Sequence, residues 1–170
     1  EAKAIAKNLG YPVTLKAVAG GGGRGIRMVD KAEDLEEALR VTRAEAALNF
    51  GLSDVYLEKR IVDPKHIEVQ ILADHQGNTV HLFERDCSIQ RRNQKVVELA
   101  PAEGISQKTR DDVFRQAITV AKYVNYEGLG TVEFLVDREG NAYFLEVNPR
   151  IQVEHTVTEM ITGVDLMQAS

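Results

Sequence analysis

GTVEFLVDREGNAYFLEVNPR, residues 130–150, predicts a β-hairpin, because two strand-like runs flank the polar turn REGN. A four-residue turn pairs Asp137 with Ala142. Counting back along both strands then places Glu133 opposite Glu146. In that register the two carboxylates lie on one face of the hairpin, with their Cβ atoms roughly 5 Å apart.

The opposed glutamates point to a metal ion. Two like charges placed directly across a strand pair are destabilising unless something neutralises them. A divalent cation does so, and carboxylate oxygens are ligands that Mg²⁺ prefers. Three other interpretations remain open: a solvated pair of surface glutamates, one protonated glutamate, or a turn that slips by one residue.

Polar residues continue at every second position after Glu146, namely at Asn148, Arg150, Gln152 and Glu154. If the segment stays extended, all five side chains project to one side. Asn148 then offers a third oxygen ligand, Arg150 suits an anion and Glu154 suits a proton acceptor. The plainer alternative is an amphipathic edge strand.

A glycine-rich loop, AGGGGRG at residues 19–25, lies between two predicted strands at 11–18 and 26–29. Glycine has no Cβ, so several backbone N–H groups can approach a phosphate closely. Lys16, on the strand that enters the loop, can add a positive charge. A Walker loop and a dinucleotide-binding fingerprint both require a different continuation. A flexible hairpin loop is the alternative.

The organisation of the chain changes near Pro64, and we expect a domain boundary at 60–64, between residues 1–61 and 62–170. The other expected elements are helices at 1–9, from a capping box at Asp30 and Glu33 to Phe50, and from Ser106, with strands at 55–61, 66–73 and 79–86. Residues 88–105 are expected to be irregular. Strands and helices in mixed order, with hairpins, indicate an α+β fold.

The composition narrows the possible classes of protein. The 170 residues are 44% hydrophobic and 28% charged, as in an ordinary globular protein, and the net charge of −5 argues against nucleic-acid binding. The single Cys87 favours a reducing compartment, and no apolar run is long enough to cross a membrane. Both ends fall inside helix-like patterns, so we expect a piece of a longer chain.

Six groups of residues together resemble biotin carboxylase, the ATP-grasp component of acetyl-CoA, pyruvate and propionyl-CoA carboxylases. They are KA at 16–17 with GGGGRG at 20–25; EK at 58–59; HIEVQ at 66–70; ERDCSIQRR at 84–92; QKVVE at 94–98; and EVNPRIQVEH at 146–155. The resemblance covers essentially the whole chain. It implies an ATP-grasp fold in which 1–61 is the small lid and 62–170 is the first part of the C-terminal subdomain, with its larger antiparallel sheet.

The resemblance also implies a role for each matching residue. The implied sets are Lys16, Gly22 and Gly23 for the ATP phosphates; Glu58, Lys59 and Ile61 for the adenine; His66, Gln90 and Asn93 for the nucleotide pocket; Glu133, Glu146 and Asn148 for Mg²⁺ or Mn²⁺; and Lys95, Arg150, Gln152 and Val153 for bicarbonate. Glu154 is the implied base. Deprotonated bicarbonate attacks the γ-phosphate to give carboxyphosphate, which releases CO₂ beside biotin, and Arg150 stabilises the biotin enolate. Many family members carry His at position 93, where asparagine can hydrogen-bond but holds no charge.

The implied activity is the ATP-dependent carboxylation of biotin on a carrier protein. A carboxyltransferase would act next, and the intact enzyme would be a homo-oligomer in the cytoplasm or the mitochondrial matrix, with neither nucleic acid nor membrane as a partner. One alternative is another ATP-grasp ligase, such as a carbamoyl-phosphate synthetase or a purine-pathway carboxylase, in which residues 150–155 are not expected in this form. Another is a non-catalytic nucleotide-binding homologue, against which the retained Glu154 and metal carboxylates argue.

Overall fold

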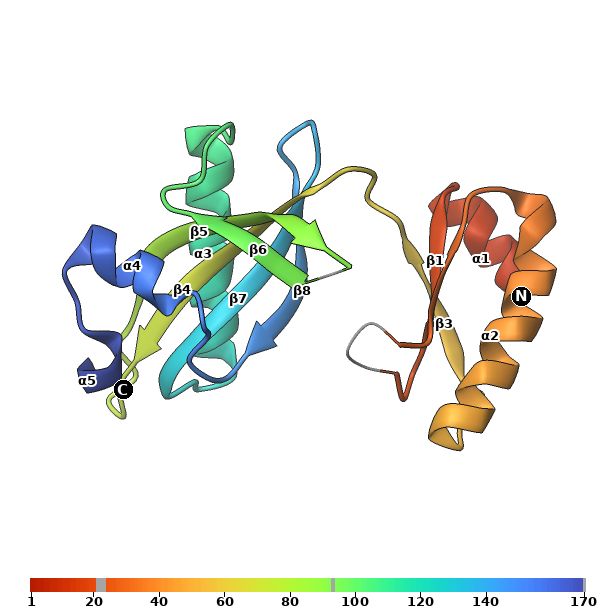
Figure 1. Cartoon of the computed structure of the whole chain (residues 1–170), viewed down its shortest axis with the longest axis horizontal. Coiled ribbons are helices and arrows are strands. Elements are labelled where there is room, and N and C mark those ends of the chain that lie inside the picture. Colours follow the sequence, from red (N-terminus) through yellow and green to blue (C-terminus); the bar gives the residue numbers. More distant parts are fainter. Residues whose placement is uncertain (21–23, 93, 170) are drawn as a thin grey trace. The chain divides into compact units, whose positions relative to one another are not determined.

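A computed structural model describes residues 1–20, 24–92 and 94–169. The chain forms two compact units, Glu1–Ile61 and Val62–Ser170. Each unit has its own antiparallel sheet and its own apolar core (Figure 1). Helices combined with antiparallel sheets confirm the predicted α+β class.

The first unit is a three-stranded sheet covered by helices. Its elements are α1 (Ala2–Leu9), β1 (Val13–Ala17), β2 (Ile26–Val29), a 3₁₀ turn (Ala32–Asp34), α2 (Leu35–Phe50) and β3 (Val55–Lys59). The strand order is β2-β1-β3. Val13 and Leu15 of the central strand are fully buried and pack with Leu35 of α2, because alternate residues of a strand face the same side.

The capping box predicted at Asp30 and Glu33 is wrong. The 3₁₀ turn comes first, and α2 begins only at Leu35, without a side-chain cap. The Asp30 carboxylate instead accepts a hydrogen bond from Arg60, at 3.0 Å. Asp30 therefore pairs with a residue distant in sequence, whereas local spacing had predicted that it caps the helix.

The second unit is a five-stranded sheet in the order β6-β5-β4-β7-β8. Its elements are β4 (Lys65–Ala73), β5 (Thr79–Arg91), β6 (Gln94–Leu99), α3 (Gln107–Tyr123), β7 (Gly128–Val136), β8 (Ala142–Asn148), α4 (His155–Thr162) and α5 (Leu166–Ala169). The Ser106 hydroxyl accepts the Thr109 backbone N–H at 3.0 Å, which confirms the predicted helix start. Among the described residues, no helix combines the length and the hydropathy needed to span a bilayer.

The two faces of the central strands β4 and β7 differ in chemistry. On one face, Val69 and Phe134 belong to an apolar core that packs against α3, which crosses this sheet (Figure 1). On the opposite face lie polar residues that are also buried, and Glu68 pairs with Glu133 across the two strands. The period of two therefore separates a hydrophobic core from a buried polar surface.

The expected irregular segment 88–105 is partly wrong. Strand β5 continues to Arg91, and β6 pairs with it through partners that include Gln90 and Lys95. Polar residues predict strands poorly because they lack the apolar alternation. Here the neighbouring strand supplies the backbone hydrogen bonds that define the element.

The predicted hairpin register is wrong at the turn and right at the glutamates. Val136, not Asp137, pairs with Ala142, so the turn has slipped by one residue. A register shift between Glu133 and Phe134 compensates, and Glu133 does stand opposite Glu146. The Asp137 carboxylate instead accepts backbone N–H groups within the turn.

The predicted continuation of a polar strand face to Glu154 is also wrong. Strand β8 ends at Asn148, and Pro149 begins an irregular segment that leads into α4. Proline lacks the N–H that a strand ladder needs, which agrees with the strand ending here.

Candidate active site

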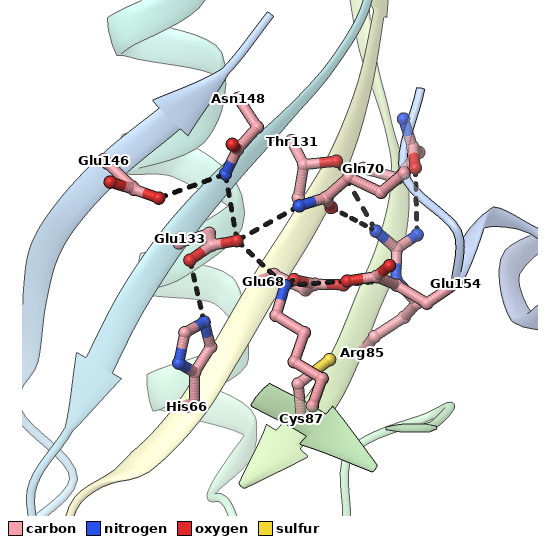
Figure 2. Close-up of polar contacts among 12 residues, drawn as sticks. His66, Glu68, Gln70, Arg85, Cys87, Thr131, Glu133, Glu146, Asn148 and Glu154 are labelled. Atoms are coloured by element: carbon pink, nitrogen blue, oxygen red, sulfur yellow. Dashed lines mark hydrogen bonds and ion pairs between the residues drawn. The ribbon is translucent and has the colours of Figure 1, made fainter. Parts of the chain in front are cut away.

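Glu133, Glu146 and Asn148 meet at the β7–β8 pair (Figure 2). The Asn148 side-chain amide donates to Glu133 Oε1 at 3.0 Å and to Glu146 Oε1 at 3.4 Å. Glu133 is buried, whereas Glu146 is exposed to solvent. Two carboxylates and an amide that can turn its oxygen toward them form a donor set that suits Mg²⁺.

Glu133 is the most heavily partnered carboxylate of the site. His66 Nε2 lies 2.9 Å from Oε2, while Lys95 Nζ and Gln152 Nε2 contact Oε1 at 2.9 and 3.2 Å. Burial works to raise the pKa of Glu133, but hydrogen bonds from His66 and Lys95 and their charges outweigh it and lower the pKa to about 2. Glu133 is therefore ionised at neutral pH.

The Lys95 ammonium group joins three carboxylates. It lies 2.9 Å from Glu133 and 2.7 Å from Glu154, and it also contacts Glu68. Burial alone would lower the pKa of Lys95, yet the carboxylates raise it above its ordinary value. A permanent positive charge thus lies between the predicted metal ligand and the predicted base.

Glu154 precedes α4 and faces this ammonium group. Burial opposes its ionisation, but the hydrogen bond from Lys95 and other favourable interactions hold the pKa of Glu154 below its usual value. The side chain is therefore ionised, as a proton acceptor must be. Of the other residues predicted in this segment, Gln152 is buried, Arg150 is exposed and donates to the Ile151 carbonyl, and Val153 is exposed.

The residues of the second unit that are predicted to line a nucleotide pocket contact one another. Gln90 Nε2 lies 3.1 Å from His66 Nδ1 and donates to the Cys87 carbonyl at 2.9 Å. Cys87 itself is fully buried, and burial raises the pKa of its thiol, so it is a buried structural side chain rather than a nucleophile. Asn93 lies outside the described residues.

The first unit holds the remaining predicted residues. Lys16 Nζ lies 2.6 Å from Glu58 Oε2 across β1 and β3. Lys59 donates to the Gly10 carbonyl at 2.8 Å, and Ile61 ends this unit. Gly22 and Gly23 lie outside the described residues.

Comparison with known proteins assigns the family. Residues 1–170 match the family described as "Carbamoyl-phosphate synthase L chain, ATP binding domain". The chain belongs to this family of ATP-binding domains. Similar members include pyruvate carboxylase 1 of Caenorhabditis elegans, 58% identical over 169 residues, and biotin carboxylase of Nostoc sp., 53% identical over 163 residues. The matches cover 99% and 96% of this chain but only 14% and 36% of those proteins.

Solved structures of this family share the fold. A biotin carboxylase–β-γ-ATP complex from Campylobacter jejuni superposes with a TM-score of 0.90 at 51% identity, covering 98% of this chain and 37% of that one. The biotin carboxylase domain of Hydrogenobacter thermophilus 2-oxoglutarate carboxylase, a dimer with MgADP, ADP and bicarbonate, gives a TM-score of 0.88 at 54% identity and the same coverage. The predicted ATP-grasp fold and the resemblance to biotin carboxylase are confirmed.

The ATP-binding domain also contains functional candidates that the sequence reasoning passed over. Glu68 and Gln70 of β4 and Arg85 of β5 are buried beside the site (Figure 2). For Glu68 and Gln70 the sequence signal is HIEVQIL at 66–72, where polar residues alternate with apolar ones along a strand. In a central strand covered on both faces, that alternation marks a buried polar surface rather than a solvated one.

Proposed function

We propose that this chain is the ATP- and bicarbonate-binding part of a biotin carboxylase, which carboxylates biotin on a carrier protein. The single observation that carries the proposal is the position of Lys95. Its ammonium group contacts both Glu133, the buried member of the proposed metal pair, and Glu154, the proposed base. A metal–nucleotide site and an anion site therefore share one fixed cation.

In this proposal Glu133, Glu146 and Asn148 hold Mg²⁺, with Mn²⁺ as an alternative, and the ion supplies positive charge beside the ATP phosphates. Their opposed register and shared amide contact support the assignment. The pair formed by half-buried His66 and buried Glu133 is part of the same surface.

Bicarbonate is the proposed anion, held by Lys95, Arg150, Gln152 and the backbone at Val153. Glu154 accepts the bicarbonate proton while a bicarbonate oxygen bonds to the γ-phosphorus and the bond to the ADP oxygen breaks. The present ion pair lowers the pKa of Glu154. An anion that shares Lys95 weakens this pair and makes Glu154 a stronger base when bicarbonate binds.

The resulting carboxyphosphate releases CO₂ for biotin, and Arg150 stabilises the negative charge that develops on biotin. Arg150 is exposed, and its guanidinium donates to the backbone carbonyl of Ile151, the next residue in the sequence. A side chain held this lightly can reach a carrier-bound substrate.

Residues 1–61 are the proposed lid over ATP, and residues 62–170 begin the C-terminal subdomain. Lys16, with Gly22 and Gly23, would bind phosphates. The other nucleotide contacts in the proposal are Glu58, Lys59, Ile61, His66, Gln90 and Asn93. The partly buried Lys16–Glu58 ion pair keeps the lysine amine beside the strand that enters the glycine loop.

The proposed partners are a biotin carrier, a carboxyltransferase and a second copy of the full-length chain. The named relatives include pyruvate carboxylases, and the 2-oxoglutarate carboxylase domain was solved as a dimer. A cytoplasmic location is part of the proposal, because the one cysteine is a free buried thiol.

The test is ADP release by the full-length protein, measured with and without bicarbonate and free biotin. We expect ATP cleavage to require bicarbonate and to respond to biotin. A different ATP-grasp ligase has no reason to respond to biotin, and a regulatory module should release no ADP. Wild-type ADP release that ignores both compounds would exclude the proposed function.

A further inference from the structure

Arg85 of β5 is a fully buried arginine surrounded by acceptors. Five side-chain contacts surround its guanidinium, and this group carries five N–H donors. The partners and distances are Glu68 at 2.6 Å from Nε, Gln70 at 2.9 Å and Thr158 at 2.7 Å from Nη1, and Gln152 at 3.2 Å and Thr131 at 3.5 Å from Nη2. Figure 2 shows the Arg85 guanidinium beside Glu68 and Gln70.

Two of these partners flank Glu154 in the sequence. Gln152 precedes it by two residues, and Thr158 follows it by four, inside α4. Strand β5 thus holds the segment on both sides of Glu154 through one planar group. The direction in which Glu154 points is restrained without any contact between its carboxylate and Arg85.

A third partner reaches the anion site from the opposite direction. Arg85 Nε donates to Glu68 Oε1, and Glu68 Oε2 contacts the Lys95 ammonium group. Glu68 is completely buried, and the hydrogen bonds from Arg85 and Lys95 each hold one of its two oxygens. Arg85 therefore restrains Lys95 through Glu68 and Glu154 through its flanking residues.

We propose that Arg85 is a positioning residue that sets the separation of Lys95 and Glu154 and thereby the affinity for bicarbonate. The proposal rests on the proposed function and adds a determinant that itself touches neither substrate nor metal. Lysine cannot replace arginine here, because an ammonium group has three donors and no rigid fork to span Glu68 and Gln152 together.

The test compares KM for bicarbonate with KM for ATP in the full-length protein. In Arg85→Lys, we expect KM for bicarbonate to rise at least tenfold and KM for ATP to stay within twofold. Thr158→Val removes one contact but keeps the guanidinium, and should raise KM for bicarbonate by a few-fold. Hydrogen exchange of the backbone at 150–162 should become faster in both variants, measured without substrates.

Val113→Ala provides the matched structural control, because Val113 is fully buried on α3 and belongs to the apolar core on the other face of the sheet. It should lower the unfolding temperature and leave both KM values near those of the wild type. If Arg85→Lys fails to fold, Thr158→Val carries the comparison.

Folded variants whose KM for bicarbonate stays within twofold, or whose two KM values rise equally, would overturn the proposal. A wild-type protein that ignores bicarbonate would remove the proposed function instead. In that case hydrogen exchange still tests whether Arg85 restrains the segment around Glu154. Faster exchange at 150–162 in the variants supports this restraint, and unchanged exchange overturns it.

Discussion

Glu133 on β7 stands directly opposite Glu146 on β8, and the side-chain amide of Asn148 donates to both carboxylates. The two glutamates nevertheless have unequal surroundings. Glu133 is buried and forms an ion pair with Lys95, whereas Glu146 is exposed. A substitution at Glu146 therefore removes a proposed metal ligand at little structural cost.

In Glu146→Gln, we expect the gain in ATP affinity that magnesium provides to fall by roughly tenfold or more. Glutamine keeps an oxygen donor but loses the charge that favours a divalent cation. Calorimetric titration of Mg·ATP into the full-length protein measures this. Glu139→Gln, in the exposed turn of the same hairpin, is the control. Equal magnesium dependence in wild type and Glu146→Gln would contradict the metal assignment.

Glu154 and Arg150 should affect different steps. Glu154→Gln removes the proposed base, so bicarbonate-dependent ADP release and biotin carboxylation should both fall by about 10²–10⁴. Arg150→Ala should reduce carboxylation more than ADP release, because the charge of Arg150 acts on biotin. Its role in holding bicarbonate also lowers ADP release, which makes the difference between the two losses smaller. Both rates are measured on the same preparations. Equal losses of the two rates in Arg150→Ala would refute the separate role.

Asp86 should stabilise the second unit fully above its ordinary titration range and progressively less below it. Burial opposes its ionisation, but hydrogen bonds from Lys65 at 2.7 Å and from Ser88 lower the pKa of Asp86. A lowered folded pKa contributes stability that is complete above the ordinary aspartate pKa of 3.8 and disappears as pH falls through the folded pKa. Asp86→Asn should therefore cost about 2 kcal/mol at pH 7.

Urea denaturation at pH 7 and at progressively lower pH measures this difference in free energy of unfolding. The difference between wild type and Asp86→Asn should shrink on acidification below the unfolded pKa. Asp63→Asn is the control, because the Asp63–Arg138 pair is exposed and should contribute little. A difference that is independent of pH would mean that the charge of Asp86 contributes nothing.

Phe134 and Phe144 of the β7–β8 hairpin differ in burial, so their replacement by alanine should cost different amounts of unfolding free energy. Phe134 is fully buried, while the paired Phe144 is 51% exposed, with ring centroids 6.3 Å apart. Phe134→Ala should cost about 3–5 kcal/mol of unfolding free energy. Phe144→Ala should cost clearly less, because water already reaches that ring. Chemical denaturation measures both, and similar losses would contradict the difference in burial between the two rings.

Local sequence was sufficient to predict a structural feature wherever the residues of a single segment define that feature. The helix that follows Ser106, the hairpin at residues 130–148 and the opposition of Glu133 to Glu146 were all predictable. The metal pair was inferred from alternation, although the turn slipped by one residue and a bulge restored the register. The assignment of the remaining residues came from family resemblance rather than from their spacing.

Tertiary structure decided the features that depend on distant partners. Strand β6 escaped prediction because its backbone bonds come from β5, and no local pattern reports them. Lys95 lies in the segment 88–105 that was expected to be irregular, yet folding brings it between carboxylates from β4, β7 and the segment before α4. Arg85 required the same information, since its acceptors lie 15–73 residues away in sequence. Sequence patterns report which side chains share a face, whereas the pairing of distant strands determines which charges meet.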